Sequence, residues 1–233
     1  MSKVTDIFKS PVGRKLLTGI TGLALTLFVI GHLMGNLTLF LGADAFNQYA
    51  SFLHELGWLI YLVEAGLIIF FGFHIYMGIS IWLRKRTARP VKYEKYASRG
   101  GKSKQTFSSQ TMIITGLVLL VFTVVHVNTF KFGAGWAGEP EYTTVVDGQE
   151  MRDLNKLVFE VFQNEFYVIG YVGVMILLGF HLRHGIWSAF QSLGTINNKL
   201  SLMIYTAGSI LAILIALGFL VLPIWVYFTG GAQ

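Results

Sequence analysis

The stretch Gly179-Phe180-His181-Leu182-Arg183-His184-Gly185-Ile186 resembles an earlier one, Gly72-Phe73-His74-Ile75-Tyr76-Met77-Gly78-Ile79. Both read Gly-Phe-His, three residues, Gly-Ile, and both lie inside long apolar runs. Histidine is costly to place in hydrocarbon, so each copy needs a partner. The glycine four residues after each histidine, Gly78 or Gly185, lies one turn further along the same helix face. There it leaves room for a flat, bulky group, and a histidine beside a cleared face is what a buried haem requires.

The alternative interpretation is that the glycine-rich faces only pack helices closely while each histidine bonds a neighbouring helix. Two further histidines, His32 and His126, also lie within apolar runs. Two copies of the motif together with two more membrane histidines favour haem over simple packing.

Composition assigns the chain to the membrane proteins. Of its 233 residues, 54% are hydrophobic and only 13% are charged, whereas soluble domains carry about 25% charged residues. The chain has no cysteine, which excludes disulfides, thiolate haem ligation, cysteine-held iron–sulfur clusters and covalent haem attachment of the c type. The net charge of +6 comes from the loops, so it indicates topology and docking and not nucleic-acid binding.

The pattern predicts an all-α membrane protein with one domain, residues 1–233, and five transmembrane helices, four of which form a haem-binding bundle. A span needs about 20 residues of helix, and the first run is too long for the core of a signal peptide, so we expect it to be retained. The five predicted spans are Leu16–Leu41, Trp58–Leu83, Thr111–Phe130, Phe166–Leu193 and Leu200–Phe228.

The connections differ in charge. We expect a short loop after the first helix, a basic segment over Arg84–Lys104, an irregular acidic loop over Lys131–Glu165 with a surface helix at Asp153–Phe162, and a tight turn at Gly194–Lys199. The N-terminus, the basic segment and the last turn hold 14 Lys or Arg residues, against three in the other two loops. The positive-inside rule therefore places the N-terminus in the cytoplasm and the C-terminus outside.

Counting along the helices places the histidines in two layers. His32 and His126 lie near the outer ends of their helices, and His74 and His181 lie nearer the inner ends. At the rise of an α-helix the layers are separated by roughly 10 Å. Two histidines from different helices in each layer predict bis-histidine ligation of two haems in a four-helix bundle. A site for a bare metal ion would need three or four ligands at one depth.

These residues resemble a known family over nearly the whole chain: the cytochrome b membrane subunit of succinate dehydrogenase and quinol:fumarate reductase, in its five-helix, two-haem form. The marks are Gly31-His32-Leu33 with Asn36, Phe73-His74 with Gly78, His126, and Phe180-His181 through Gly185-Ile186-Trp187-Ser188 to Gly194. The resemblance implies an inner and an outer haem b, ligated by the four histidines in the pairing above. It also implies a flavoprotein and an iron–sulfur subunit on the cytoplasmic side, menaquinone as the common quinone, and a place in the bacterial inner membrane.

Two residues beside His181 have open roles. His184 shares a helix side with His181 and is a rival ligand. The internal match with the His74 stretch selects His181 as the ligand, so we expect His184 to be a hydrogen-bonding neighbour of the haem or of a helix. Arg183 is expected either to pair a haem propionate or to reach the cytoplasmic interface.

The quinone is expected near the His32–His126 layer, because a second haem is useful only if electrons are needed, or originate, on the outer side. Quinone reduction takes up protons, and Glu64, Glu55 and His54 are the ionisable residues available there. We expect Glu64 to be the best buried of the three. The basic segment Arg84–Lys104 is expected to face the iron–sulfur subunit or anionic membrane lipid. The alternative is an ordinary positive-inside loop, whose charges set only the topology.

Two other classes of function stay open. One is a dihaem cytochrome b subunit of another respiratory enzyme, of the hydrogenase or formate dehydrogenase type. The other is a haem-free transporter or scaffold, for which broken helices and a polar midplane site are expected. The sequence contains no recognisable dicarboxylate site, so we expect succinate chemistry to belong to a partner subunit.

Overall fold

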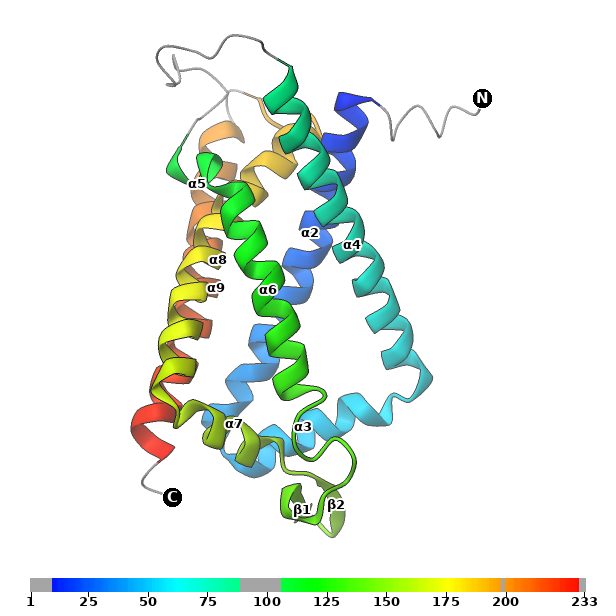
Figure 1. Cartoon of the computed structure of the whole chain (residues 1–233), viewed down its shortest axis with the longest axis vertical. Helices are drawn as coiled ribbons and strands as arrows, with labels where there is room; N and C mark the ends of the chain where they lie inside the picture. The colour runs from blue at the N-terminus through cyan, green and yellow to red at the C-terminus, as the bar shows by residue number, and fades with distance from the viewer. Residues whose placement is uncertain (1–9, 89–105, 198–199, 231–233) are drawn as a thin grey trace. The chain divides into compact units, whose positions relative to one another are not determined.

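Five helices long and apolar enough to cross a membrane form most of the chain, as the sequence predicts. The structure is a computed structural model, and it describes residues 10–88, 106–197 and 200–230. The five helices are α2 (Pro11–Leu37), α4 (Trp58–Thr87), α6 (Met112–Phe130), α8 (Glu165–Ser192) and α9 (Leu200–Thr229) (Figure 1). This is the pattern of a multi-pass membrane protein.

The first spanning helix begins five residues earlier than its apolar run predicts. The Ser10 hydroxyl accepts a hydrogen bond from the Gly13 N–H at 2.9 Å, which satisfies one of the free donors at the helix start. Pro11 occupies the first helical position, where a missing N–H costs nothing. The helix therefore starts at its capping signal and not at the first apolar residue.

Short elements connect the long helices, and one of them corrects the sequence analysis. The segment after α2 is not a plain loop, because the 3-10 helix η1 (Thr38–Leu41) leads into α3 (Ala43–Glu55). Phe46 and Asn47 are buried on α3, so one face of this helix packs inward. The helix predicted at 153–162 is confirmed as α7 (Leu154–Phe162), and one of its faces is buried. Two further short helices are α5 (Phe107–Gln110) and the 3-10 helix η2 (Pro140–Tyr142).

The acidic loop contains a β-hairpin that the sequence analysis missed. Strands β1 (Thr143–Val146) and β2 (Gln149–Arg152) pair antiparallel. The turn residues Asp147 and Gly148 both have positive φ, 51° and 78°, as a two-residue hairpin turn of type I′ requires. The Asp-Gly pair between two short β-rich runs was the available signal.

By its internal contacts the chain forms two compact units, each with a share of every spanning helix. The first unit comprises Met1–Leu27, Gly66–Leu117 and Gly179–Ile213. The second comprises Phe28–Ala65, Val118–Leu178 and Leu214–Gln233. His74 and His181 belong to the first unit, and His32 and His126 belong to the second, so the two predicted layers fall in different units.

The second unit holds a cap made of α3, α7 and the hairpin, which lie close together (Figure 1). Asn47, only 2% exposed, joins two of these elements. Its side-chain amide donates to Asp153 at 2.9 Å, and its carbonyl accepts from the Asn155 N–H at 2.9 Å. Asp153 also caps α7 by accepting from the Lys156 N–H at 3.0 Å. A single buried amide therefore fixes the start of α7 against α3.

Some of the basic residues that predict the orientation in the membrane lie outside the described residues. The basic docking segment 84–104 is described only as far as residue 88, and its first residues complete α4, which ends at Thr87. Lys3, Lys9 and Lys199, which contribute to the predicted orientation, also lie outside the described ranges.

Candidate functional site

The second unit brings the rings of His32 on α2 and His126 on α6 next to each other. Their ring centroids are 5.6 Å apart, and the ring planes make an angle of 84°. Each ring also stacks on a phenylalanine one turn earlier in its own helix, His32 on Phe28 and His126 on Phe122. The sequence-predicted pairing of these two histidines agrees with this geometry.

The first unit brings His74 of α4 and His181 of α8 together in the same manner. Their ring centroids are 6.3 Å apart with an interplanar angle of 67°. The rival ligand His184 lies on the same helix as His181 and is half-buried, but His181 is the residue whose ring faces His74.

Both pairs have a spacing that fits a shared iron atom. An imidazole nitrogen lies about 2 Å from the metal it binds, so two rings on opposite sides of one iron have centroids about 6 Å apart. The two observed distances, 5.6 and 6.3 Å, agree with that separation. Among the described residues no three His, Asp or Glu side chains converge to hold a metal ion. The spacing of each histidine pair is what fits two ligands of one haem iron.

In the His74–His181 pair, the Nδ1 atom of each ring contacts an oxygen atom of a neighbouring helix. His74 Nδ1 lies 3.2 Å from the Thr18 carbonyl oxygen and 3.4 Å from Thr21 Oγ1. His181 Nδ1 lies 3.1 Å from Thr115 Oγ1. A metal-binding histidine characteristically donates its other ring N–H to such an acceptor, which fixes its orientation. In both residues Nε2 is the nitrogen left for a ligand.

The His32–His126 pair is supported differently. His126 Nδ1 lies 3.2 Å from the Tyr171 hydroxyl, so its Nε2 is likewise left for a ligand. The Asn36 side-chain nitrogen lies 3.4 Å from His32 Nε2 and donates to the His32 carbonyl at 2.7 Å. A nitrogen that accepts from Asn36 has no lone pair for iron, so ligation through Nε2 requires the His32 ring to turn away from Asn36.

The glycines predicted to clear space beside two histidines do stand in open space. A Cβ atom added at Gly78 or at Gly185 meets no atom of the described residues within 4 Å. This agrees with the room expected one turn beyond His74 and beyond His181.

Arg183 is engaged within the first unit. Its guanidinium donates to Ser108 Oγ at 3.4 Å and to the Tyr205 hydroxyl, and it lies 5.2 Å from the centre of the Tyr205 ring. Arg14 of α2 similarly donates to the hydroxyl of Ser80 on α4. Each arginine thus joins neighbouring helices through a hydroxyl group.

The three predicted quinone residues have separate surroundings. Glu64 forms an ion pair with Lys131, and their side chains are 34% and 32% exposed, so Glu64 is half-buried and its charge is balanced. Glu55 is exposed, accepts from Ser51 at 3.2 Å, and lines a polar cavity of about 240 Å³ between α3 and the hairpin. His54 is exposed on α3. Glu64 is the most buried of the three, as expected.

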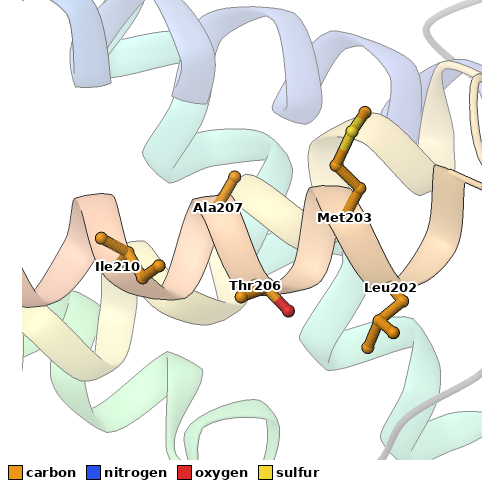
Figure 2. A pocket seen from close by; sticks show the side chains of 5 residues that line it. All are labelled: Leu202, Met203, Thr206, Ala207 and Ile210. Atoms are coloured by element: carbon orange, nitrogen blue, oxygen red, sulfur yellow. The ribbon is translucent and has the colours of Figure 1, made fainter.

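The last helix presents an apolar surface. Its groove of about 460 Å³ is lined by residues of α9 alone, and Figure 2 shows that their side chains are apolar apart from one hydroxyl group. The lining residues are Leu202, Met203, Thr206, Ala207 and Ile210. A surface of this composition suits contact with lipid.

A second internal repeat, missed in the sequence analysis, explains much of this arrangement. The pattern Ile-Thr-Gly-Leu, four residues, Phe, three residues, His begins at Ile20 and recurs 94 residues later at Ile114. The first copy ends at His32 and the second at His126. The Thr and Gly of the first copy lie against His74, and those of the second copy lie against His181. The Phe of each copy stacks on the histidine that ends the same copy. Aligning the chain with itself would have revealed these residues.

Comparison of the chain with protein-family models, with curated proteins and with solved structures found no match.

Proposed function

We propose that this chain is the membrane-anchor cytochrome b subunit of a succinate:quinone oxidoreductase of the succinate dehydrogenase or fumarate reductase type. The observation that carries the proposal is the pair of adjacent histidine rings in each unit, with centroid separations of 5.6 and 6.3 Å. Four different helices supply the four histidines. The motifs quoted from the sequence support the choice of family.

In this proposal His32 and His126 hold one haem b, and His74 and His181 hold the other. When bound, the haems supply one-electron chemistry between an iron–sulfur subunit and membrane quinone. Thr21, Thr115 and the Thr18 carbonyl keep the inner ligand rings in place through Nδ1. Arg183 would pair a propionate by exchanging a hydroxyl partner, Ser108 or Tyr205, for the carboxylate.

The partners follow from the same assignment. A flavoprotein carries the dicarboxylate chemistry, and an iron–sulfur subunit docks on the cytoplasmic side, where the N-terminus and the basic segment 84–104 lie in the predicted orientation. The chain resides in the bacterial inner membrane, in contact with lipid.

The quinone, of the menaquinone type, is proposed to react near the His32–His126 pair. Its protons pass through Glu64, with Glu55 and His54 as ionisable groups nearer the aqueous phase. Glu64 is paired with Lys131, so the carboxylate that would carry the protons is held in place by a neighbouring cation.

A reduced-minus-oxidised optical spectrum of the purified chain tests the haem assignment. We expect a b-type spectrum with two haems per chain, and a spectrum without haem would leave a transporter or scaffold. Haem reduction by succinate in the native complex then tests the partner. Reduction by formate or hydrogen, and not by succinate, would select the other respiratory enzymes.

A further inference from the structure

We infer that two Thr-Gly pairs, Thr21-Gly22 and Thr115-Gly116, are positioning residues for the ligands His74 and His181. This inference rests on the proposed function, in which the His74–His181 pair ligates haem iron. Each Thr-Gly pair belongs to one copy of the 94-residue repeat, and each lies against a histidine of the partner helix. The same residue types therefore make the same contact twice.

The hydroxyl of Thr115 acts as an acceptor toward the histidine. Thr115 Oγ1 donates its only hydrogen to the Met112 carbonyl at 3.1 Å. Its lone pairs then remain for His181 Nδ1, 3.1 Å away, so the ring nitrogen must be the donor. This assigns His181 to the tautomer with hydrogen on Nδ1 and leaves the Nε2 lone pair free for a metal.

The same reasoning holds for His74 in the other copy. Thr21 Oγ1 donates to the Leu17 carbonyl at 2.8 Å, so it accepts from the ring. The Thr18 carbonyl, 3.2 Å from His74 Nδ1, can only accept. Both neighbours of His74 Nδ1 thus require the same tautomer that His181 adopts.

The glycines let the rings lie directly against the neighbouring helix. A Cβ added at Gly22 would stand 3.0 Å from Cε1 of His74, and one added at Gly116 would stand 3.4 Å from Cε1 of His181. The first distance is a tight contact that the ring can relieve only by moving a few tenths of an ångström, and the second is ordinary contact. An alanine should therefore displace His74 and leave His181 nearly undisturbed.

The two copies of the repeat are not equivalent, so removing the threonine hydroxyl should have a larger effect in one copy than in the other. His74 Nδ1 has two acceptors, whereas Thr115 is the acceptor that the structure gives to His181 Nδ1. Removing the Thr115 hydroxyl deprives His181 of that partner. Removing the Thr21 hydroxyl leaves His74 the Thr18 carbonyl, so the effect should be smaller.

The experiment uses the full-length protein in its complex, with Thr115→Val, Thr115→Ser and Thr21→Val. Valine keeps the shape of threonine without the hydroxyl, and serine keeps the hydroxyl. Thr123→Val is the matched control, because Thr123 lies on the same helix and donates to the Leu119 carbonyl at 2.8 Å. The readouts are haem per chain, the low-spin ferric electron paramagnetic resonance signal and the midpoint potential of each haem.

Loss of an outer-shell hydrogen bond typically weakens metal binding about 10- to 100-fold. We expect Thr115→Val to weaken retention of one haem by about tenfold or more and to raise its midpoint potential, because a histidine without its acceptor is a weaker electron donor. Thr115→Ser should restore both values, Thr21→Val should have the smaller effect, and Thr123→Val should match wild type.

The possible outcomes distinguish the positioning role of the Thr-Gly pairs from the proposed function. A wild-type protein without haem would overturn both. Two haems in wild type, with the signal and potential of both unchanged in Thr115→Val, would overturn the positioning role alone. A change that Thr115→Ser fails to restore, or that Thr123→Val reproduces, would also overturn it, because the change would then come from packing.

Discussion

Arg152 is the side chain whose removal should most disturb the cap of the second unit. Its guanidinium donates to four backbone carbonyls around the end of α6: Phe130 at 3.0 Å, Lys131 at 3.2 Å, Gly133 at 3.3 Å, and Ala134 at 3.1 Å from Nε and 2.5 Å from Nη2. The last carbonyls of a helix have no partner within the helix, and its C-terminus attracts a positive charge. Arg152 supplies both the donors and the charge.

The magnitude follows from these contacts. A hydrogen bond from a charged donor contributes about 1.5–3 kcal/mol, and a cation at a helix C-terminus adds about 0.3–1 kcal/mol. Arg152 is half-buried, and water can replace part of what is lost, so we expect Arg152→Ala to lower the free energy of unfolding by about 3 kcal/mol. Burial lowers the pKa of Arg152 and Glu139 opposes that shift, but a guanidinium stays charged at neutral pH.

Equilibrium unfolding of the purified protein in mixed detergent micelles measures this loss. Arg152→Lys keeps the charge but not the planar fork of donors, so it should recover only part of the stability. Lys156→Ala is the control, since its ion pairs with Glu141 and Glu160 are largely exposed and such pairs contribute about 0–1 kcal/mol. Equal stability of wild type and Arg152→Ala would refute the reasoning, as would full recovery by Arg152→Lys.

Two further predictions concern the ligands and the proton path. His181→Ala should remove one of two haems by optical spectroscopy, while His184→Ala should keep both; the reverse result would assign ligation to His184. Glu64→Gln should keep both haems but slow quinone turnover severalfold, and the double variant with Lys131→Met, which removes the unpaired charge, should remain slow. Normal turnover in Glu64→Gln would place the proton donor elsewhere.

The spanning helices were predictable because length and apolarity are enough to define them. Their ends were less so, since the start of α2 depends on the cap at Ser10 and on Pro11 and not on hydropathy. The helix α3 was missed for a different reason. Its polar residues suggested a loop, and its burial of Phe46 and Asn47 depends on α7, which lies more than 90 residues further along the chain.

The histidine pairing was predictable because depth in a membrane follows from counting along straight helices. The residues that surround the histidine rings were not predictable. The contact of Thr115 with His181 joins residues on different helices, and counting gives depth but no rotation about the helix axis. The hydrogen bonds from Arg152 to the carbonyls at the end of α6 are also a tertiary feature. In the sequence, Arg152 is simply one basic residue in an acidic loop.

Each histidine pair contains one residue from each half of the chain. His32 and His74 precede the basic segment 84–104, and their partners His126 and His181 follow it. Under the proposed function, neither half therefore contains a complete pair of haem ligands. We expect a fragment ending within that segment, and the fragment that begins there, each to lack a low-spin bis-histidine spectrum when expressed alone.

Expressed together, the two fragments should assemble and recover up to two haems, because the paired rings and the Thr-Gly contacts lie across the cut. Haem binding then adds to the free energy that holds the halves together, since it occurs only in the assembled form. Removal of haem should accordingly weaken their association in a pull-down assay. A single fragment that binds haem with a bis-histidine spectrum, for example by pairing with a second copy of itself, would contradict the need for both halves.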